Sequence, residues 1–402
     1  MRKIILLICV LIYISPAIAG GYKKIGIDKH KIYRYDFDLS SSTLELTRAL
    51  DDGKFALENV LTCSRRHASD AAFNGGFYHE GYGRSGVPVW LMINSSNVFA
   101  IKSNQFALYI TKDNEIKFDK LKTNIFLQSD RNKKIEISSI NNPAPSGIKL
   151  FTQNYWTSTL SNPGTFEIIV ENNIISSINH NGNNKIPHDG FVISANNSKN
   201  LQELSRLQVG EKLSYNLSIS AGKKQLDLSK ISTVMSGSDM LLKDSKIPTN
   251  ITSKENSSPF RDAPHGRTAI CQFDETKYAV YVADHNPAKN IYEITIRDII
   301  IPLKKAGLDR ETAMKMRLEE LIQKYQTIEA REDFSIGMLL GDFAKFLKQE
   351  GCKNVINLDG GGSATLVVEN KVINTPSGLQ NINIEGKNLR NVGDIFLIKK
   401  KK

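Results

Sequence analysis

The stretch VINLDGGGSATLVV, residues 355–368, places an acid and three consecutive glycines between two runs of β-branched and apolar residues. The residues that follow the glycines have strand character, so the pattern predicts a strand, a tight turn and a second strand. This excludes dinucleotide-binding and phosphate-binding loops of the kind that need a helix directly behind the glycines. Glycines can bring bare backbone N–H groups close to an anion, and Asp359 would stand at the edge of such a site.

Two further stretches have the same character. In DAAFNGGFYHEGYG (70–83), an apolar run ends at Asn74 and continues into two glycines. In HGRTAICQF (265–273), Arg267 leads into an apolar strand, and its planar guanidinium suits phosphate. Each stretch alone fits a hairpin turn or a surface arginine equally well. Together with the first stretch, they predict one anion site built from distant parts of the chain.

The start of the chain predicts export. MRKIILLICVLIYISPAIAG combines basic Arg2 and Lys3 with a short apolar run and a small-residue cleavage pattern at 17–19. We interpret residues 1–19 as a signal peptide and expect a secreted or periplasmic protein, with an uncleaved membrane anchor as the alternative. Since no other stretch is apolar enough to cross a bilayer, no stable membrane span is expected after cleavage.

Charge narrows the class of partner. The 402-residue chain has a formal net charge of +11 at pH 7, which favours anionic partners such as phosphorylated carbohydrate. A solvated basic surface with a terminal lysine cluster is the simpler alternative. Nucleic acid is not expected as a partner, because no helix-turn-helix, zinc or base-stacking motif is present.

Cysteine usage predicts a single disulfide. Without the leader, the chain keeps Cys63, Cys271 and Cys352, which in an oxidising compartment permit one disulfide and one free thiol. The sequence leaves open which two cysteines pair.

Short β segments dominate the chain up to about residue 242, and helices are expected only in the C-terminal third. The expected strands are KIYRYDFDL (31–39), VWLMINSSNVFAI (89–101), FALYITKDNEIKF (106–118), TFEIIVENNIISSI (165–178), GFVISA (190–195) and KLSYNLSIS (212–220). One helix is expected over 308–333 and another over 335–351. The second would have Ser335 as its N-cap, Gly351 as its stop, and Leu339, Phe343, Phe346 and Leu347 on its apolar side. We therefore predict an α+β fold with strand-rich mixed or antiparallel sheets and a few C-terminal helices that form one continuous core.

A set of motifs in a fixed order resembles the phosphodiester glycosidase family, whose bacterial members are often labelled exopolysaccharide biosynthesis proteins. The motifs are Asn74-Gly75-Gly76-Phe77, Arg267-Thr268-Ala269, Asp284, Gly337-Met338, Leu358-Asp359-Gly360-Gly361-Gly362-Ser363, and Arg390 followed by Val392. The resemblance runs from about residue 31 to residue 398. It implies one domain over 20–402, in which 285–334 is long for the family and is expected to be an insertion.

The resemblance implies hydrolysis of a sugar-1-phosphodiester between the anomeric carbon and the phosphate oxygen, on envelope or extracellular glycans. Asp359 and Asp284 are the expected catalytic carboxylates, since glycosidases usually need two. Arg267 and Arg390 are expected to bind the phosphate, and Asn74 to hold sugar hydroxyls. The other expected substrate-binding or phosphate-binding residues are Gly75, Thr268, Gly360, Gly361, Gly362 and Ser363.

The sequence leaves three points open. The family commonly continues its strand-end acid with Gly-Arg, whereas here Asp284 is followed by His285. No cofactor is demanded, although Ca²⁺ or Mg²⁺ at Asp359 or Asp284 would suit the carboxylates. Two alternative functions compete: a non-catalytic glycan-binding protein in exopolysaccharide assembly, and a phosphodiesterase that breaks the P–O bond and leaves the sugar phosphorylated.

Overall fold

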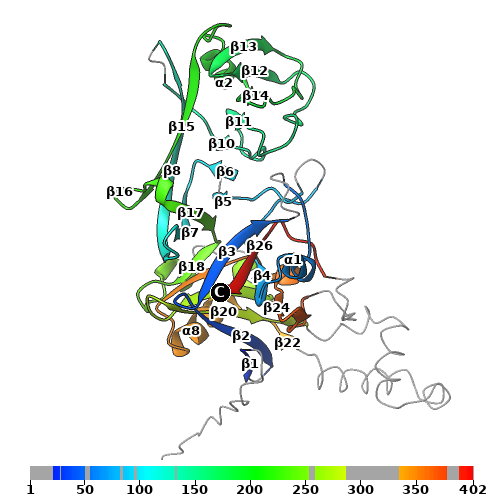
Figure 1. Cartoon of the computed structure of the whole chain (residues 1–402), viewed down its shortest axis with the longest axis vertical. Helices are drawn as coiled ribbons and strands as arrows, with labels where there is room; N and C mark the ends of the chain where they lie inside the picture. The colour runs from blue at the N-terminus through cyan, green and yellow to red at the C-terminus, as the bar shows by residue number, and fades with distance from the viewer. Residues whose placement is uncertain are drawn as a thin grey trace, which may run out of the picture.

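Alternating apolar side chains build a six-stranded sheet in the lower body of the protein (Figure 1). The structure is a computed structural model, and it describes residues 21–27, 29–49, 55–81, 85–94, 97–131, 134–252, 259–286, 335–377 and 389–401. The strands follow each other across the sheet in the order β1 (Tyr22–Ile27), β2 (His30–Asp38), β20 (Lys277–Ala283), β19 (Arg267–Gln272), β23 (Asn354–Asn357) and β18 (Asp239–Leu242). All neighbouring pairs are antiparallel.

A five-stranded antiparallel sheet lies beside the first and carries the other half of the candidate site. Its order is β25 (Lys371–Val372), β24 (Leu366–Val368), β4 (Ala71–Asn74), β26 (Asp394–Lys400) and β3 (Ser42–Arg48). One buried cluster contains Phe73 and Phe396 from this sheet together with Ile270 and Val280 from the first. A shared core therefore fixes the ends of β4, β19, β23 and β26 relative to one another.

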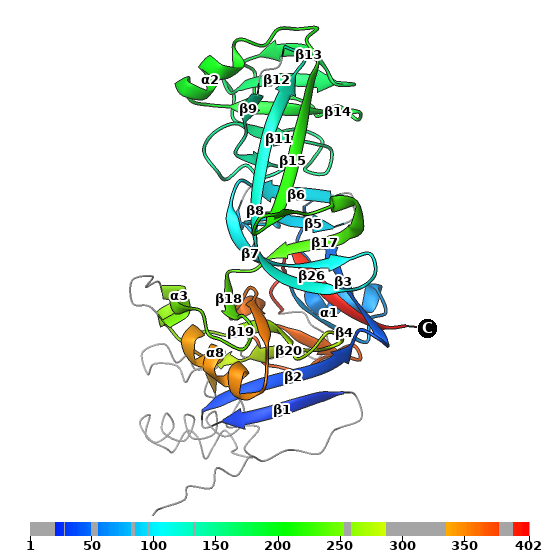
Figure 2. The same cartoon turned by 90° about the vertical axis from the view of Figure 1, so that its left-hand side faces the viewer.

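The third sheet makes the molecule elongated, because its longest strands run from the body into a distal lobe (Figures 1 and 2). The order is β13 (Ile174–Asn179), β12 (Phe166–Glu171), β14 (Gly190–Ala195), β11 (Lys149–Phe151), β10 (Ser139–Ile140), β6 (Asn97–Ile101), β5 (Met92–Asn94), β17 (Ile231–Ser236), β7 (Asn104–Thr111), β8 (Ile116–Ser129), β15 (Leu213–Ala221) and β16 (Lys224–Gln225), with β9 (Lys134–Glu136) beside β8. Among the described strands, β10 and β11 form the one parallel pair. The expected mixed and antiparallel sheets are therefore confirmed.

Short helices are spread more widely than the sequence predicts. They are α1 (Val60–Arg66), α2 (Ser198–Leu204), η1 (Leu228–Lys230), α3 (Thr249–Thr252), α4 (Pro259–Asp262), α8 (Leu340–Gln349) and η4 (Gly361–Ser363). Both α1 and α2 lie before the C-terminal third, so the expectation that helices occur only in that third is wrong. The buried apolar side chains also group into four clusters instead of one, because the distal lobe has a core of its own.

The expected helix over 335–351 begins later, at Leu340, and its N-cap is Leu339, which makes no side-chain capping bond. Ser335 belongs instead to β22 (Ser335–Ile336), which pairs with β21 (His285–Asn286), and its hydroxyl donates to the Asp284 carbonyl at 2.8 Å. That bond removes the hydroxyl from any capping role. Leu339 is exposed, whereas Phe343, Phe346 and Leu347 are buried as expected. The left-handed Gly351, with φ of +88°, ends the helix.

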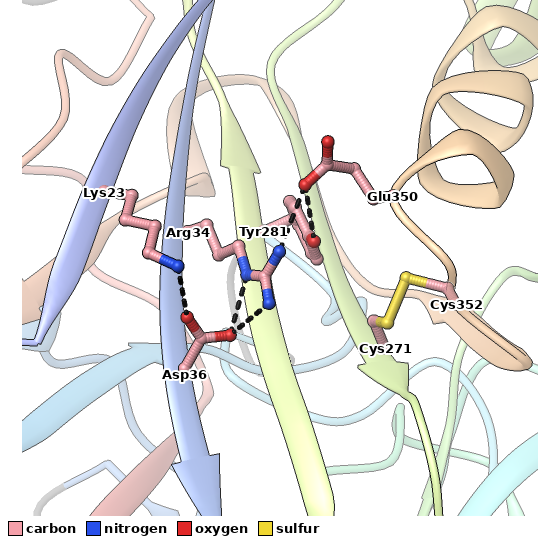
Figure 3. A network of polar contacts seen from close by, with 7 residues as sticks. All are labelled: Lys23, Arg34, Asp36, Cys271, Tyr281, Glu350 and Cys352. Atoms are coloured by element: carbon pink, nitrogen blue, oxygen red, sulfur yellow. Dashed lines mark hydrogen bonds and ion pairs between the residues drawn. A yellow bond between two sulfur atoms is a disulfide. The ribbon is translucent and has the colours of Figure 1, made fainter. Parts of the chain in front are cut away.

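A disulfide between Cys271 and Cys352 joins β19 to the segment after α8, and Cys63 is a buried free cysteine (Figure 3). Figure 3 also shows Arg34, on β2, donating to Glu350 at 3.1 Å. Tyr281 donates to the same carboxylate at 3.1 Å. These contacts fasten α8 to the outer face of the six-stranded sheet.

Three expectations fall outside the described residues: the leader over 1–19, the helix over 308–333, and nearly all of the insertion over 285–334. Within the described ranges, no helix combines the length and the hydropathy needed to cross a bilayer.

Candidate active site

The three glycines after Asp359 have three different structural reasons. A Cβ on Gly360 would lie 2.4 Å from the carbonyl oxygen of Gly266, so this glycine permits close packing of two backbones. Gly361 adopts the left-handed conformation, with φ of +60°. A Cβ on Gly362 would lie 3.3 Å from Nε of Arg390, so its absence makes room for the guanidinium.

The backbone N–H groups of this turn are largely occupied. The Gly361 N–H donates to the Gly266 carbonyl at 2.9 Å, and the Gly360 N–H donates to the Asp359 carboxylate at 2.8 Å. The expected cradle of three N–H groups for an anion is therefore not preformed. The turn serves instead to aim the Asp359 carboxylate.

Asn74, at the end of β4, ties the turn to β19. Its Nδ2 donates to the Asp359 carbonyl at 2.8 Å and weakly to the Gly75 carbonyl at 3.4 Å. Its Oδ1 accepts from the Thr268 hydroxyl at 2.8 Å and from the Thr365 N–H at 3.2 Å. An amide offers two donors and two acceptor positions, so these four bonds leave none for a sugar hydroxyl. Asn74 is fully buried and holds the site in shape.

Asp394 supports the same corner from β26. Its Oδ1 accepts from the Gly76 N–H at 2.7 Å, and its carbonyl accepts from the Gly75 N–H at 3.0 Å. A Cβ on Gly75 would lie 1.9 Å from that Oδ1, which explains the glycine. Burial and the negative charge of Asp359 raise the pKa of Asp394 to about 7, and the charge of Arg48 opposes the rise.

The Asp359 carboxylate is partly buried and faces groups from three parts of the chain. Burial raises the pKa of Asp359 to about 6, whereas the Ser363 hydroxyl, the Gly360 N–H and the charge of Arg390 act to lower it. Arg390 is 49% exposed and lies 3.9 Å from the Glu80 carboxylate. The site is therefore open to solvent on the side of Arg390.

Tyr78 completes the group. Its hydroxyl donates to the Asn391 carbonyl at 2.8 Å and lies 3.3 Å from the Glu80 carboxylate. Burial raises the pKa of Tyr78 to about 12, with the Ser363 hydroxyl acting in the opposite direction and the charge of Asp359 reinforcing the rise. The phenol is therefore neutral near pH 7, and it donates its one proton to the Asn391 carbonyl.

We call these five residues the Asp359 cluster: Tyr78, Glu80, Asp359, Ser363 and Arg390. The sequence motifs identified Asp359, Ser363 and Arg390 but missed Tyr78, Glu80 and the supporting Asp394. A signal existed, because Tyr78 and Glu80 follow directly after the Asn-Gly-Gly-Phe motif and Asp394 lies two residues beyond Val392.

Arg267 lies apart from the cluster. Successive strand residues point to opposite faces, and Thr268 takes the face that contacts Asn74. The Arg267 guanidinium is fully buried, donating to the Met338 carbonyl at 2.9 Å and to the Phe260 carbonyl at 2.7 Å. Burial lowers the pKa of Arg267 to about 10, opposed by the charge of Asp239, so it remains cationic at neutral pH.

Asp284 is also buried and committed to protein donors. Its Oδ1 accepts from the Asn374 amide at 2.9 Å, and the Thr375 N–H lies 2.9 and 3.0 Å from its two oxygens. Burial raises the pKa of Asp284 to about 7, and these hydrogen bonds oppose the rise. The segment that contains Asn374 and Thr375 continues to Ser377. The carbonyl oxygen of Ser377 lies 3.3 Å from the position that a Cβ on Gly362 would take. Asp284 therefore braces the chain beside the glycine turn.

Metal ligands do not converge in the part of the chain that the structure describes: no set of three His, Cys, Asp or Glu side chains there could hold a metal ion.

The fold and the cluster define a strand-rich α+β protein with a partly buried acid beside an exposed guanidinium and a neutral phenol. Residues 326–399 match the sequence model of the family described as phosphodiester glycosidase. The match confirms the resemblance drawn from the motifs over this segment, which holds Asp359, Ser363, Arg390 and Asp394. The match indicates a glycosidase-type enzyme in general terms.

Other relatives support the fold. An uncharacterized protein of Rickettsia conorii is 23% identical over 64% of this chain and 92% of its own length. The solved structure of a hypothetical protein from Synechocystis superposes with a TM-score of 0.69 at 16% identity, covering 95% of this chain. This chain spans only 62% of that Synechocystis protein. A structure from Burkholderia pseudomallei gives a TM-score of 0.66 at 16% identity, over 92% of this chain and 74% of the other.

Proposed function

We propose that the protein hydrolyses a sugar-1-phosphodiester, releasing the free sugar and a phosphomonoester. One observation carries the proposal: the Asp359 carboxylate, with its raised pKa, lies beside Arg390 and the Ser363 and Tyr78 hydroxyls. The segment that matches the family contains three of these four residues. A carboxylate and a cation are what cleavage at a phosphorylated anomeric carbon requires.

In the proposed reaction, ionised Asp359 accepts a proton from water as the water oxygen attacks the anomeric carbon. The bond between that carbon and the bridging oxygen breaks, and the phosphomonoester leaves with the electron pair. A phosphate leaving group needs little help from a general acid, so one reacting carboxylate suffices. Arg390 neutralises the charge that grows on the departing phosphate.

Two neutral hydroxyl groups support the site in this scheme. The Tyr78 phenol keeps its proton near pH 7 and donates it to the Asn391 carbonyl, so its oxygen can accept from a sugar hydroxyl. The Ser363 hydroxyl is fully buried and lies close to both Tyr78 and Asp359, so it positions these two side chains.

We assign positioning roles to three residues that the motifs would place in contact with substrate. The polar side-chain atoms of Asn74 and Asp284 form hydrogen bonds within the protein. Two nitrogens of Arg267 donate to backbone carbonyls. They hold the turn, the segment beside it and the end of β19. Glu80 is the second carboxylate of the cluster, and its contacts with Tyr78 and Arg390 hold those two side chains in place.

The cellular setting belongs to the same proposal. The predicted leader supports export, and the basic net charge supports phosphorylated glycans of the envelope or extracellular space as substrates. A Ca²⁺ or Mg²⁺ requirement stays a prediction, tested by measuring turnover after chelation and after readdition of each ion.

The experiment that tests the reaction is hydrolysis of UDP-linked sugars in H₂¹⁸O. Release of free sugar with no label on the phosphate of the UDP product supports the proposed C–O cleavage. Label on phosphate identifies P–O cleavage and overturns it. Saturable binding of glycans with no released sugar would favour the non-catalytic alternative.

A further inference from the structure

We infer a second ligand site, separate from the Asp359 cluster, that binds a neutral oligosaccharide. It is a pocket of about 680 Å³ at the base of the distal lobe, where Phe55 meets the chain between β11 and β14. Its volume lies in the range of small-molecule sites, and such sites favour the junction between two parts of a fold. The inference does not depend on the proposed hydrolysis.

One wall of the pocket is aromatic. Phe55 lies with its ring centroid 5.1 Å from that of Tyr155 and 5.2 Å from that of Trp156, and Phe151 lies 4.8 Å from Tyr155. Phe55 and Trp156 are only partly buried, so ring surface remains accessible. A pyranose ring has faces of C–H groups that pack well on such surfaces, because aromatic rings bury large apolar areas with defined geometry.

The remaining walls are polar and almost uncharged. Asn162, Asn183 and Asn196 line the pocket, and Lys149 is the one charged residue among those lining it in the described part of the chain. The amides of Asn162 and Asn196 make no hydrogen bond to described residues, and both residues are exposed. An amide pairs a donor with an acceptor, which matches two neighbouring sugar hydroxyls. This lining suits a neutral polyhydroxyl ligand and disfavours a cation.

The edge of the pocket is strained. Leu160 has a φ of +52° and is 40% exposed, although a bulky apolar residue is rarely left-handed and gains nothing from water. Backbone strain of this kind concentrates at functional sites, where surrounding structure holds it. Here it places an apolar side chain at the pocket beside the aromatic wall.

A short connection separates the pocket from the Asp359 cluster. Gly86 packs on the carbonyl of Ala56, next to Phe55, where a Cβ would lie 1.9 Å away. On the other side, Gly393 packs between Gly86 and Tyr78, with contacts of 2.8 and 3.1 Å to a Cβ built on it. The two sites are therefore neighbours in the fold, and each is formed by its own residues.

The test uses tryptophan fluorescence, since the chain has two tryptophans and Trp90→Phe leaves Trp156 as the sole reporter. The probes are neutral tetrasaccharides: α-1,4-glucan, β-1,4-glucan, β-1,3-glucan and β-1,4-linked N-acetylglucosamine. We expect at least one to cause a saturable shift. No saturable shift with any of the four overturns the inference.

Calorimetry with the binding tetrasaccharide then locates the site. Trp156→Ala should weaken binding at least tenfold, equivalent to about 1.4 kcal/mol, whereas Trp156→Phe should retain most of it and guards against misfolding. Tyr215→Ala, an exposed aromatic elsewhere in the lobe, should leave Kd unchanged. An unchanged Kd for Trp156→Ala overturns the inference. Asp359→Asn should bind normally, and lost binding in that variant would contradict a separate site.

Discussion

The side-chain amide of Asn74 donates across two sheets to the main-chain carbonyl of Asp359, at 2.8 Å. This bond links the end of β4 to the glycine turn. The Thr268 hydroxyl on β19 donates to Oδ1 of the same Asn74 side chain. The proposed reacting acid is thus held through its backbone, by a residue that does not itself face solvent.

Asn74→Asp should destabilise the protein and abolish turnover. The substitution replaces the Nδ2 amide nitrogen with an oxygen that faces the carbonyls of Asp359 and Gly75. These two carbonyls then lose their hydrogen-bond donor. We expect a loss of about 1–3 kcal/mol in the free energy of unfolding, measured by urea denaturation. Asn162→Asp, the same change at an exposed position, is the control. Equal stability of the two variants would contradict the role of Asn74.

Arg390 should set the acidic limb of the pH–rate profile. If Asp359 reacts in its ionised form, kcat rises with pH as the carboxyl deprotonates near its pKa of about 6. The positive charge of Arg390 lowers that pKa, so Arg390→Gln should move the limb to higher pH. Arg390→Lys keeps the charge and should leave the limb near its original position. A limb that stays in place in Arg390→Gln would disprove the electrostatic coupling.

Asp394 should make stability depend on pH. Its pKa is about 7 in the folded protein and about 4 when unfolded, so ionisation costs more in the folded state. The stability that it contributes is full below pH 4 and is lost as pH rises to 7, by up to about 1.4 kcal/mol for each pH unit. Asp394→Asn mimics the protonated acid, so the decline in unfolding free energy from pH 4 to 7 should become shallower. Asp284, which has a similarly raised pKa, accounts for part of the remaining slope. An unchanged slope in Asp394→Asn would contradict the buried-acid interpretation.

Reduction of the disulfide should loosen the sheet that supports α8. Cys271 and Cys352 are 81 residues apart in sequence, and closing a loop of that size stabilises a fold by about 4 kcal/mol. Dithiothreitol should therefore lower the Tm of the wild-type protein. The Cys271→Ala/Cys352→Ala double variant should melt at a low temperature that dithiothreitol does not change. A wild-type Tm that is insensitive to the reductant would count against the bridge.

The strands could be predicted from sequence because alternation and turn residues are local signals. KIYRYDFDL became β2, with Tyr33, Tyr35 and Phe37 buried on one face. The sequence predicts Ser335 as a helix cap, and this prediction is wrong. The Ser335 hydroxyl donates instead to the carbonyl of Asp284, a contact between distant segments that the local sequence does not indicate. Likewise, the disulfide pair depends on the contact of β19 with β23, which no spacing in the sequence encodes.

The candidate site could be predicted only in part. The glycine motif correctly located a turn carrying Asp359, but the direction of the Arg267 side chain depends on which face of β19 meets β4. The sequence alone does not specify which residues of β19 face β4. The sequence did not identify Tyr78 and Asp394, because a single tyrosine or an acid at the start of a strand is common in sequences that have no such site. Their roles follow from contacts with chain segments hundreds of residues away.

The most direct test of the central claim compares turnover of a UDP-linked sugar by the wild-type protein, Asp359→Asn and Asp189→Asn. The last variant makes the same change at an exposed aspartate in the distal lobe. We predict that Asp359→Asn folds normally but loses at least about 10²-fold in kcat, while Asp189→Asn matches the wild type. Wild-type turnover by a folded Asp359→Asn variant would contradict the account.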